Sequence, residues 1–146
     1  MKFDPTFTWE PDNGLATCIL TDGNEVYCGY ANCHPDDFDM MSQLTGQEIA
    51  YRRARIEYFV SVRDHELKPA LKALKHVYGT MTHSTKFDPK SYATIALLRE
   101  IRNLENDLTA IKEEIIEERV ALKRYIITKD EYYKQIRARR NKGKIN

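Results

Sequence analysis

The chain has 146 residues, of which 42% are apolar and 31% are charged, and its formal net charge is +1. This length predicts one domain, or a small head with an extension. No run of about 18 apolar residues occurs and the N-terminus is acidic, so we expect neither a transmembrane helix nor a signal peptide, and a cytoplasmic protein.

The charge is segregated along the chain. Residues 1–50 hold one Lys and nine acids, hence a net charge of −8. Residues 120–146 hold nine Lys/Arg and two acids, hence a net charge of +7. Such segregation reports on partners or self-association and does not determine a fold.

Residues 6–33 are expected to form a three-stranded antiparallel meander. A short β-rich run at 7–9 ends at the turn cluster 11–14. Residues 15–21 and 25–31 alternate in polarity and flank Asp22-Gly23-Asn24, which is a strong hairpin signal.

The register of this hairpin depends on its loop length. A three-residue loop at 22–24 is favoured, because it brings the apolar faces of both strands together and places Cys18 opposite Cys28. A two-residue Asp-Gly loop is the alternative. With the favoured register, the core on the following helix is expected to contain Cys18, Leu20, Val26, Cys28, Ile49, Ile56 and Phe59.

A helix is expected from Gln47 to Arg63, with Thr45 as N-cap and Glu48 completing a capping box. A break or kink should follow before Pro69. A short helix then ends at Gly79.

After a loop at 80–89, a long helix is expected from Ser91. Its heptad pattern predicts a coiled-coil or helical-hairpin stripe. We expect this stripe to form an interface between copies of the chain, and pairing within the chain is the alternative. The stripe consists of Leu97, Ile101, Leu104, Leu108, Ile111, Ile115 and Leu122. Thr128 and Glu131 form a second capping-box pattern, which predicts a separate final helix from Asp130 to about Arg140 and a frayed tail.

The expected fold class is therefore α+β, a meander packed on a helix and followed by a mainly helical arm. Residues 1–79 would be the head, 80–90 a linker loop, and 91–146 the arm.

Metal and catalytic motifs are weak. Cys28, Cys33 and His34, with Cys18 nearby, have ligand types that zinc prefers, but lack a paired-cysteine knuckle. We therefore expect reduced thiols, no metal, no cofactor and no small-molecule substrate. The other histidines (His65, His76 and His83) and the acids Asp36, Asp37 and Asp39 have no catalytic or calcium-loop spacing, so no enzyme activity is expected.

Two basic clusters are candidate phosphate contacts. Arg52, Arg53 and Arg55 lie between tyrosines on the first helix, where pairing with the acidic face of the nearby strands is an equal alternative. The C-terminal cluster consists of Lys134, Arg137, Arg139, Arg140 and Lys142. It follows two tyrosines and is the stronger candidate, against the alternative of a solubilising helix end.

Three short patterns carry a family resemblance. They are Leu15-Ala16-x-Cys18-x-Leu20, Gly29-x-Ala31-x-x-x-Pro35-x-Asp37 and Gly46-x-Glu48-x-Ala50-x-x-Arg53-Ala54. Residues 7–63 thus resemble small bacterial and phage proteins with a double-stranded-RNA-binding-domain-like fold. The resemblance implies a three-stranded sheet on a helix. It does not extend to RNA binding, because acids precede the helix whose N-terminus grips phosphate in such domains.

These patterns together predict a non-enzymatic binding protein, encoded by a phage or mobile element and acting in the host cytoplasm. An acidic head and a self-associating arm would make its contacts, as a homo-oligomer and with a host protein or nucleic acid. One alternative is a nucleic-acid-binding protein that uses the basic C-terminal helix. Another is an acidic decoy that inhibits a host nucleic-acid-binding enzyme.

Overall fold

The computed structural model describes residues 3–33 and 42–144. The chain forms two compact units. Unit 1 combines the first 58 residues with residues 117–146, and unit 2 consists of residues 59–116. These boundaries differ from the head, linker and arm predicted above. Within the described residues, no helix is both long and apolar enough to cross a membrane.

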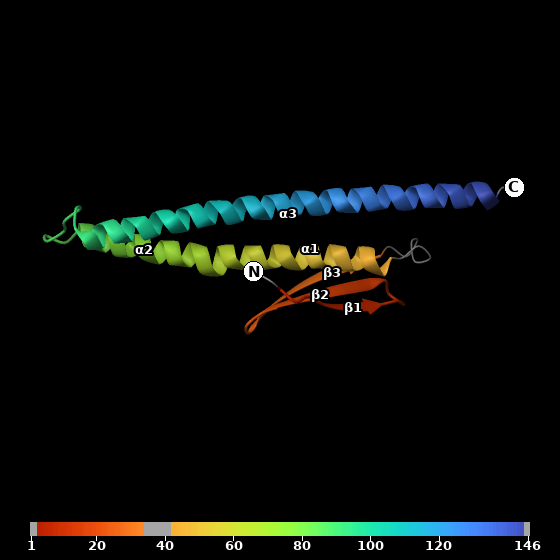
Figure 1. Cartoon of the computed structure of the whole chain (residues 1–146), viewed down its shortest axis with the longest axis horizontal. Coiled ribbons are helices and arrows are strands. Elements are labelled where there is room, and N and C mark those ends of the chain that lie inside the picture. Colours follow the sequence, from red (N-terminus) through yellow and green to blue (C-terminus); the bar gives the residue numbers. More distant parts are fainter. Residues whose placement is uncertain (1–2, 34–41, 145–146) are drawn as a thin grey trace. The chain divides into compact units, whose positions relative to one another are not determined.

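Unit 1 contains the expected antiparallel meander, which confirms the α+β class. The strands are β1 (Thr6–Glu10), β2 (Leu15–Asp22) and β3 (Glu25–Asn32), in the order β1-β2-β3. Figure 1 shows α1 (Gln43–Ser61) between this sheet and the C-terminal half of α3 (Tyr92–Lys144). Unit 1 is therefore layered as sheet, helix, helix.

The predicted register of the hairpin is wrong. Asp22 pairs with Glu25, so the loop has two residues, and Cys18 lies opposite Gly29. Gly23 has φ = 60°, a left-handed conformation that glycine adopts without strain and that tight hairpin turns require. The inner face of β3 consequently consists of Tyr27, Gly29 and Ala31. Val26 is 55% exposed and Cys28 lies on the outer face.

Small side chains line the contact between the sheet and α1. The buried core holds Ala16, Cys18, Leu20, Ala31, Ala50 and Ala54, with Trp9, Tyr27 and Ile49 packed at its margin. A Cβ atom on Gly29 would lie 2.0 Å from the carbonyl oxygen of Ala50. The α1 helix therefore lies so close to β3 that only a residue without a Cβ atom fits at position 29. This close packing determines that Gly29, and with it Tyr27 and Ala31, faces the helix. Of the other expected core residues, Ile56 is buried and Phe59 is half-buried.

The first helix begins earlier than predicted. Ser42 caps it by accepting a hydrogen bond from the Thr45 backbone N–H (3.2 Å), so Thr45 lies inside the first turn and is not the N-cap. An early start lets Gly46 pack against Ala16 and Trp9.

Unit 2 is an antiparallel helical hairpin. The expected break before Pro69 is a π-helical turn, η2 (Val62–Leu67), in which the Lys68 N–H donates to the Arg63 carbonyl five residues earlier. The wider turn leads directly into α2 (Lys68–Thr82), which holds Pro69 as its second residue. Figure 1 shows α2 beside the first half of α3, and Lys75 pairs with Glu105 across them (3.2 Å).

The third helix is a single element of 53 residues. Ser91 caps it, since its hydroxyl accepts the Thr94 N–H (3.2 Å). The predicted separate final helix is wrong, and so is the predicted fraying before Lys144. Neither Gly nor Pro interrupts residues 92–142, so nothing obliges the helix to end at Thr128.

Candidate functional site

The three arginines of α1 make contacts within unit 1. The Arg52 Nε bonds Glu48 (2.9 Å) and its guanidinium lies over the Tyr125 ring. Arg53 donates to the Tyr30 carbonyl on the free edge of β3 (2.6 Å). Arg55 pairs with Glu118 (3.0 Å). Each arginine therefore has a partner within unit 1. These partners are glutamates of α1 and α3 and a backbone carbonyl of β3, whereas the expected partner was the acidic face of the strands.

The pair between Arg55 and Glu118 is the polar centre of the contact between α1 and α3. The Glu118 side chain is only 12% exposed, and its Oε2 atom is buried with no hydrogen-bond partner among the described residues. In the heptad pattern Glu118 occupies a position otherwise reserved for an apolar residue. A buried charge at such a position favours one register of two helices over its neighbours.

The heptad stripe of α3 is covered by the chain itself. Ile101 and Ile115 are buried, and the remaining five side chains (Leu97, Leu104, Leu108, Ile111 and Leu122) are half-buried. An interface between copies is not needed to explain the burial of this stripe. Its predicted role in self-association remains a prediction.

The C-terminal basic cluster lies on ordered helix. Lys134, Arg139 and Lys142 are exposed on α3, as is Arg140, whereas Arg137 is half-buried. Between 118 and 144, α3 carries ten Lys/Arg and three acids, a net charge of +7. The strands and turns at 3–33 carry five acids and no Lys, Arg or His. Opposite charges are thus presented by different elements of unit 1.

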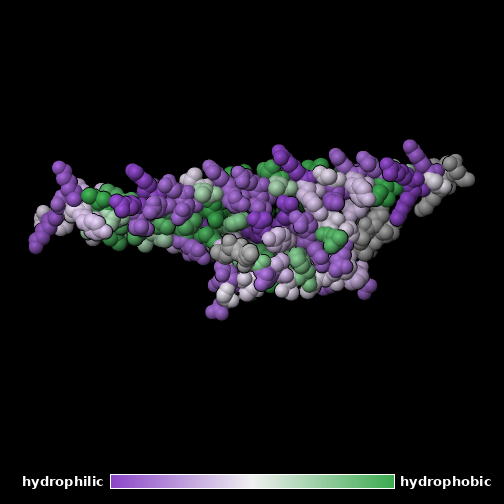
Figure 2. Space-filling view, in the orientation of Figure 1, coloured by the Kyte–Doolittle hydropathy of each residue, from purple (hydrophilic) through white to green (hydrophobic). Residues whose placement is uncertain are grey.

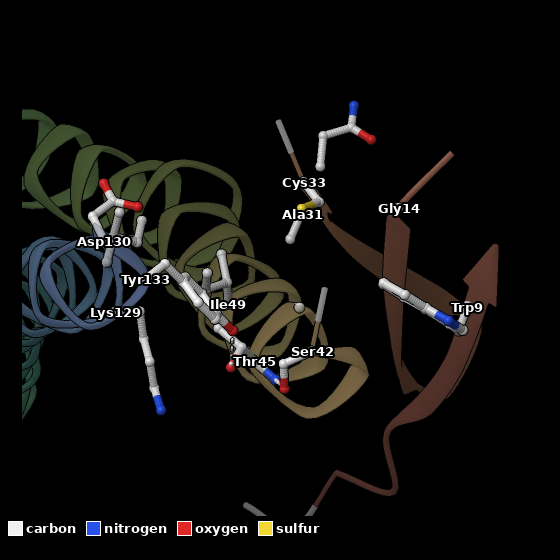
Figure 3. A pocket seen from close by; sticks show the side chains of 13 residues that line it. Trp9, Gly14, Ala31, Cys33, Ser42, Thr45, Ile49, Lys129, Asp130 and Tyr133 are labelled. Atoms are coloured by element: carbon white, nitrogen blue, oxygen red, sulfur yellow. Dashed lines mark hydrogen bonds between the residues drawn. The ribbon is translucent and has the colours of Figure 1, made fainter. Parts of the chain in front are cut away.

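A small pocket opens where the N-terminus of α1 meets the sheet and α3. Trp9 lines one side, and Ile49 and Tyr133 line the other, with the Tyr133 hydroxyl 3.4 Å from that of Thr45 (Figure 3). Its volume is about 110 Å³. Sites for organic cofactors usually exceed about 300 Å³. The pocket at this corner of unit 1 lies below that range and has room for a few waters.

The three cysteines do not converge. Cys18 lies on the inner face of the sheet and Cys28 on the outer face, because Cys28 pairs with Ile19 in the register. Burial, followed by the nearby Cys28 thiol, raises the pKa of Cys18 to about 11. Within residues 3–33 and 42–144, no three side chains of ligand type gather around one point. His34, Asp36, Asp37 and Asp39 lie outside the described residues, and the histidines at 65, 76 and 83 are exposed in unit 2.

Sequence reasoning missed one surface. Hydrophobic side chains interrupt the hydrophilic edge of α3 near the middle of the helix (Figure 2). Within unit 1, Val120 and Ile127 are 43% and 47% exposed. Their spacing of seven residues is visible in the sequence, but the heptad stripe from Leu97 to Leu122 has the same spacing and more members, so the sequence favours that stripe as the apolar face of the helix.

Comparison with protein-family models, curated proteins and solved structures finds no match, so the double-stranded-RNA-binding-domain-like character of residues 7–63 remains a resemblance.

Proposed function

We propose that this chain is a non-enzymatic binding protein whose C-terminal helical segment, residues 134–142, contacts the phosphates of nucleic acid. The observation that carries the proposal is the location of this basic cluster on regular, exposed helix. Cationic residues on a regular helix lose less backbone conformational entropy on binding than those of a frayed tail. The other basic cluster, on α1, has partners within unit 1.

Electrostatics also orient the interaction. The acids at 3–33 repel phosphate, so nucleic acid should approach unit 1 from α3 and not from the strands. Phosphate contacts alone carry no sequence information, so this mode predicts binding with little sequence preference.

Salt dependence tests the proposal. Fluorescence anisotropy would measure the affinity for labelled duplex DNA and duplex RNA between about 50 and 200 mM salt. We expect the triple variant Lys134→Glu, Arg139→Glu, Lys142→Glu to lose affinity and to lower the log–log salt slope by about 2–3, because each phosphate contact contributes about 0.9.

The matched control changes the same charge elsewhere. Lys72→Glu, Lys86→Glu, Lys90→Glu alters three exposed lysines of unit 2 and should keep the wild-type slope. An equal loss of affinity in both variants would show that binding depends on the net charge of the protein and not on residues 134–142. No binding by the wild-type protein at low salt would reject the proposal.

The acidic strands favour a second candidate, the decoy that occupies a basic protein of the host. All five acids at 3–33 are exposed. Capture by immobilised protein with and without nuclease separates the two. A decoy retains a basic protein after nuclease treatment, whereas the leading proposal predicts nuclease-sensitive material. Phage or mobile-element origin and action in a host cytoplasm are part of this candidate.

A further inference from the structure

Tyr132 is an exposed aromatic residue within the basic part of α3. It is 55% exposed, and its ring makes an edge contact with the Tyr133 ring at a centroid distance of 5.6 Å. Tyr133 is half-buried and its hydroxyl lies 3.4 Å from that of Thr45, so this second tyrosine packs within unit 1. Packing within unit 1 therefore accounts for Tyr133, whereas more than half of Tyr132 is open to solvent.

Cations accompany this ring along one face of the helix. The Lys129 Nζ atom lies 5.9 Å from the centre of the Tyr132 ring and 5.6 Å from that of Tyr125. Arg139 is exposed two helical turns after Tyr132, and so lies on the same face. The two acids of this segment, at 130 and 131, lie about 100° or more from Tyr132 around the helix axis. An exposed aromatic ring is thus flanked by cations, which distinguishes it from an ordinary exposed side chain.

We infer that Tyr132 stacks on an unpaired base and thereby favours single-stranded nucleic acid over duplexes. This inference rests on the proposed function, in which residues 134–142 contact phosphates. Each nucleotide of a single strand carries a phosphate, which Lys129 or Arg139 can pair with, and a base whose face can stack on the neighbouring ring. The bases of a duplex are stacked on one another and offer the ring no free face. Every base has a π-face, so stacking agrees with binding of little sequence preference.

Strands with and without bases test the stacking. Fluorescence anisotropy would compare labelled oligothymidylate, oligouridylate, duplex DNA and an abasic strand, which keeps the phosphates and lacks the bases. Tyr132→Leu should weaken binding to both base-containing single strands about tenfold, because the stacking contact is lost. Its affinity for the abasic strand and for duplex DNA should stay within about twofold of the wild type, and its salt slope should not change, because no charge is removed. The circular dichroism of this variant should match the wild type.

Two further variants serve as controls. Tyr132→Phe keeps the ring and should bind every probe to within about twofold of the wild type. Tyr92→Leu removes a tyrosine that is 87% exposed at the start of α3 in unit 2, and it should leave binding unchanged.

The outcomes separate this inference from the proposed function. A Tyr132→Leu variant that binds single strands as the wild type does, or that weakens binding to the abasic strand equally, would overturn the stacking and leave the phosphate contacts in place. A loss in Tyr132→Phe as large as that in Tyr132→Leu would assign the contact to the hydroxyl group and would also overturn the stacking. A wild-type protein that binds none of these probes at low salt would reject the proposed function and the stacking together.

Discussion

Replacing Gly29 by Ala should destabilise unit 1 although it adds a single methyl group. The new Cβ atom would lie 2.0 Å from the Ala50 oxygen and 2.5 Å from the Ala54 nitrogen. Both neighbours are backbone atoms of α1, so no side-chain rotation can relieve the contact. Because ordinary contacts lie at 3.4–4 Å, α1 must withdraw from β3 by more than an ångström.

Two effects of the Gly29→Ala substitution on the free energy of unfolding oppose each other. Removing a glycine from a strand gains about 0.5–1 kcal/mol. Overpacking typically costs about 1–3 kcal/mol, and a rigid backbone neighbour places this site at the upper end. We therefore expect a net loss of about 2 kcal/mol or more in the free energy of unfolding. For a chain of this length, that corresponds to a fall of about 4–8 °C in melting temperature.

Urea denaturation followed by the fluorescence of Trp9 is the appropriate assay, because Trp9 is the one tryptophan in the sequence and packs beside the core of unit 1. Gly79→Ala is the matched control. Gly79 lies within α2, and a Cβ atom added to it would meet no atom within 4 Å, so alanine there should stabilise unit 2 by about 1 kcal/mol. A Gly29→Ala protein as stable as the wild type would refute the close packing of α1 on β3.

Three further predictions concern single side chains. Ile115→Asp should cost more than about 3 kcal/mol and Ile116→Asp less than about 0.5 kcal/mol in thermal melts, because these neighbours are 1% and 61% exposed. Glu118→Ala should cost about 1–3 kcal/mol, whereas Glu118→Leu with Arg55→Met should recover that loss in urea denaturation, since an apolar pair needs no desolvation of charge. The Cys18 thiol should react with iodoacetamide at pH 8 only after denaturation, because the pKa of Cys18 is about 11 in the fold. The protonated thiol therefore contributes to the free energy of unfolding in full below pH 9.0, the ordinary pKa of cysteine, and this contribution is lost as the pH rises through about 11.

The sequence predicted the fold class well because its strongest signals are local. Alternating strands around Asp22-Gly23-Asn24 required a hairpin, and the heptad repeat required a long helix. The same patterns could not determine the face of β3, because side-chain size favours burying Val26 and Tyr30 over Gly29 and Ala31. Close approach of α1 reverses that ranking, and the distance between two layers is a tertiary quantity.

The candidate sites show the same division. The pattern Thr128-x-x-Glu131 resembles a helix start, but a capping box acts only where the chain turns, and α3 does not turn there. The arginines of α1 were visible as a cluster, whereas their partners Glu118 and the Tyr30 carbonyl come from distant segments. The sequence therefore showed where basic residues cluster, but it could not show which of them are paired with other parts of the chain.

The composition of unit 1 has a consequence for the order of folding. Its first 58 residues and its last 30 are separated in the sequence by the whole of unit 2. Unit 2 closes through a short loop, so its contacts are local and should form quickly. During synthesis the sheet and α1 emerge before unit 2, whereas their helical neighbour, the C-terminal half of α3, emerges after it. We expect the face of α1 that receives Glu118 and Tyr125 to stay solvated until this part of α3 has been synthesised, which makes completion of unit 1 the slow, late step of folding.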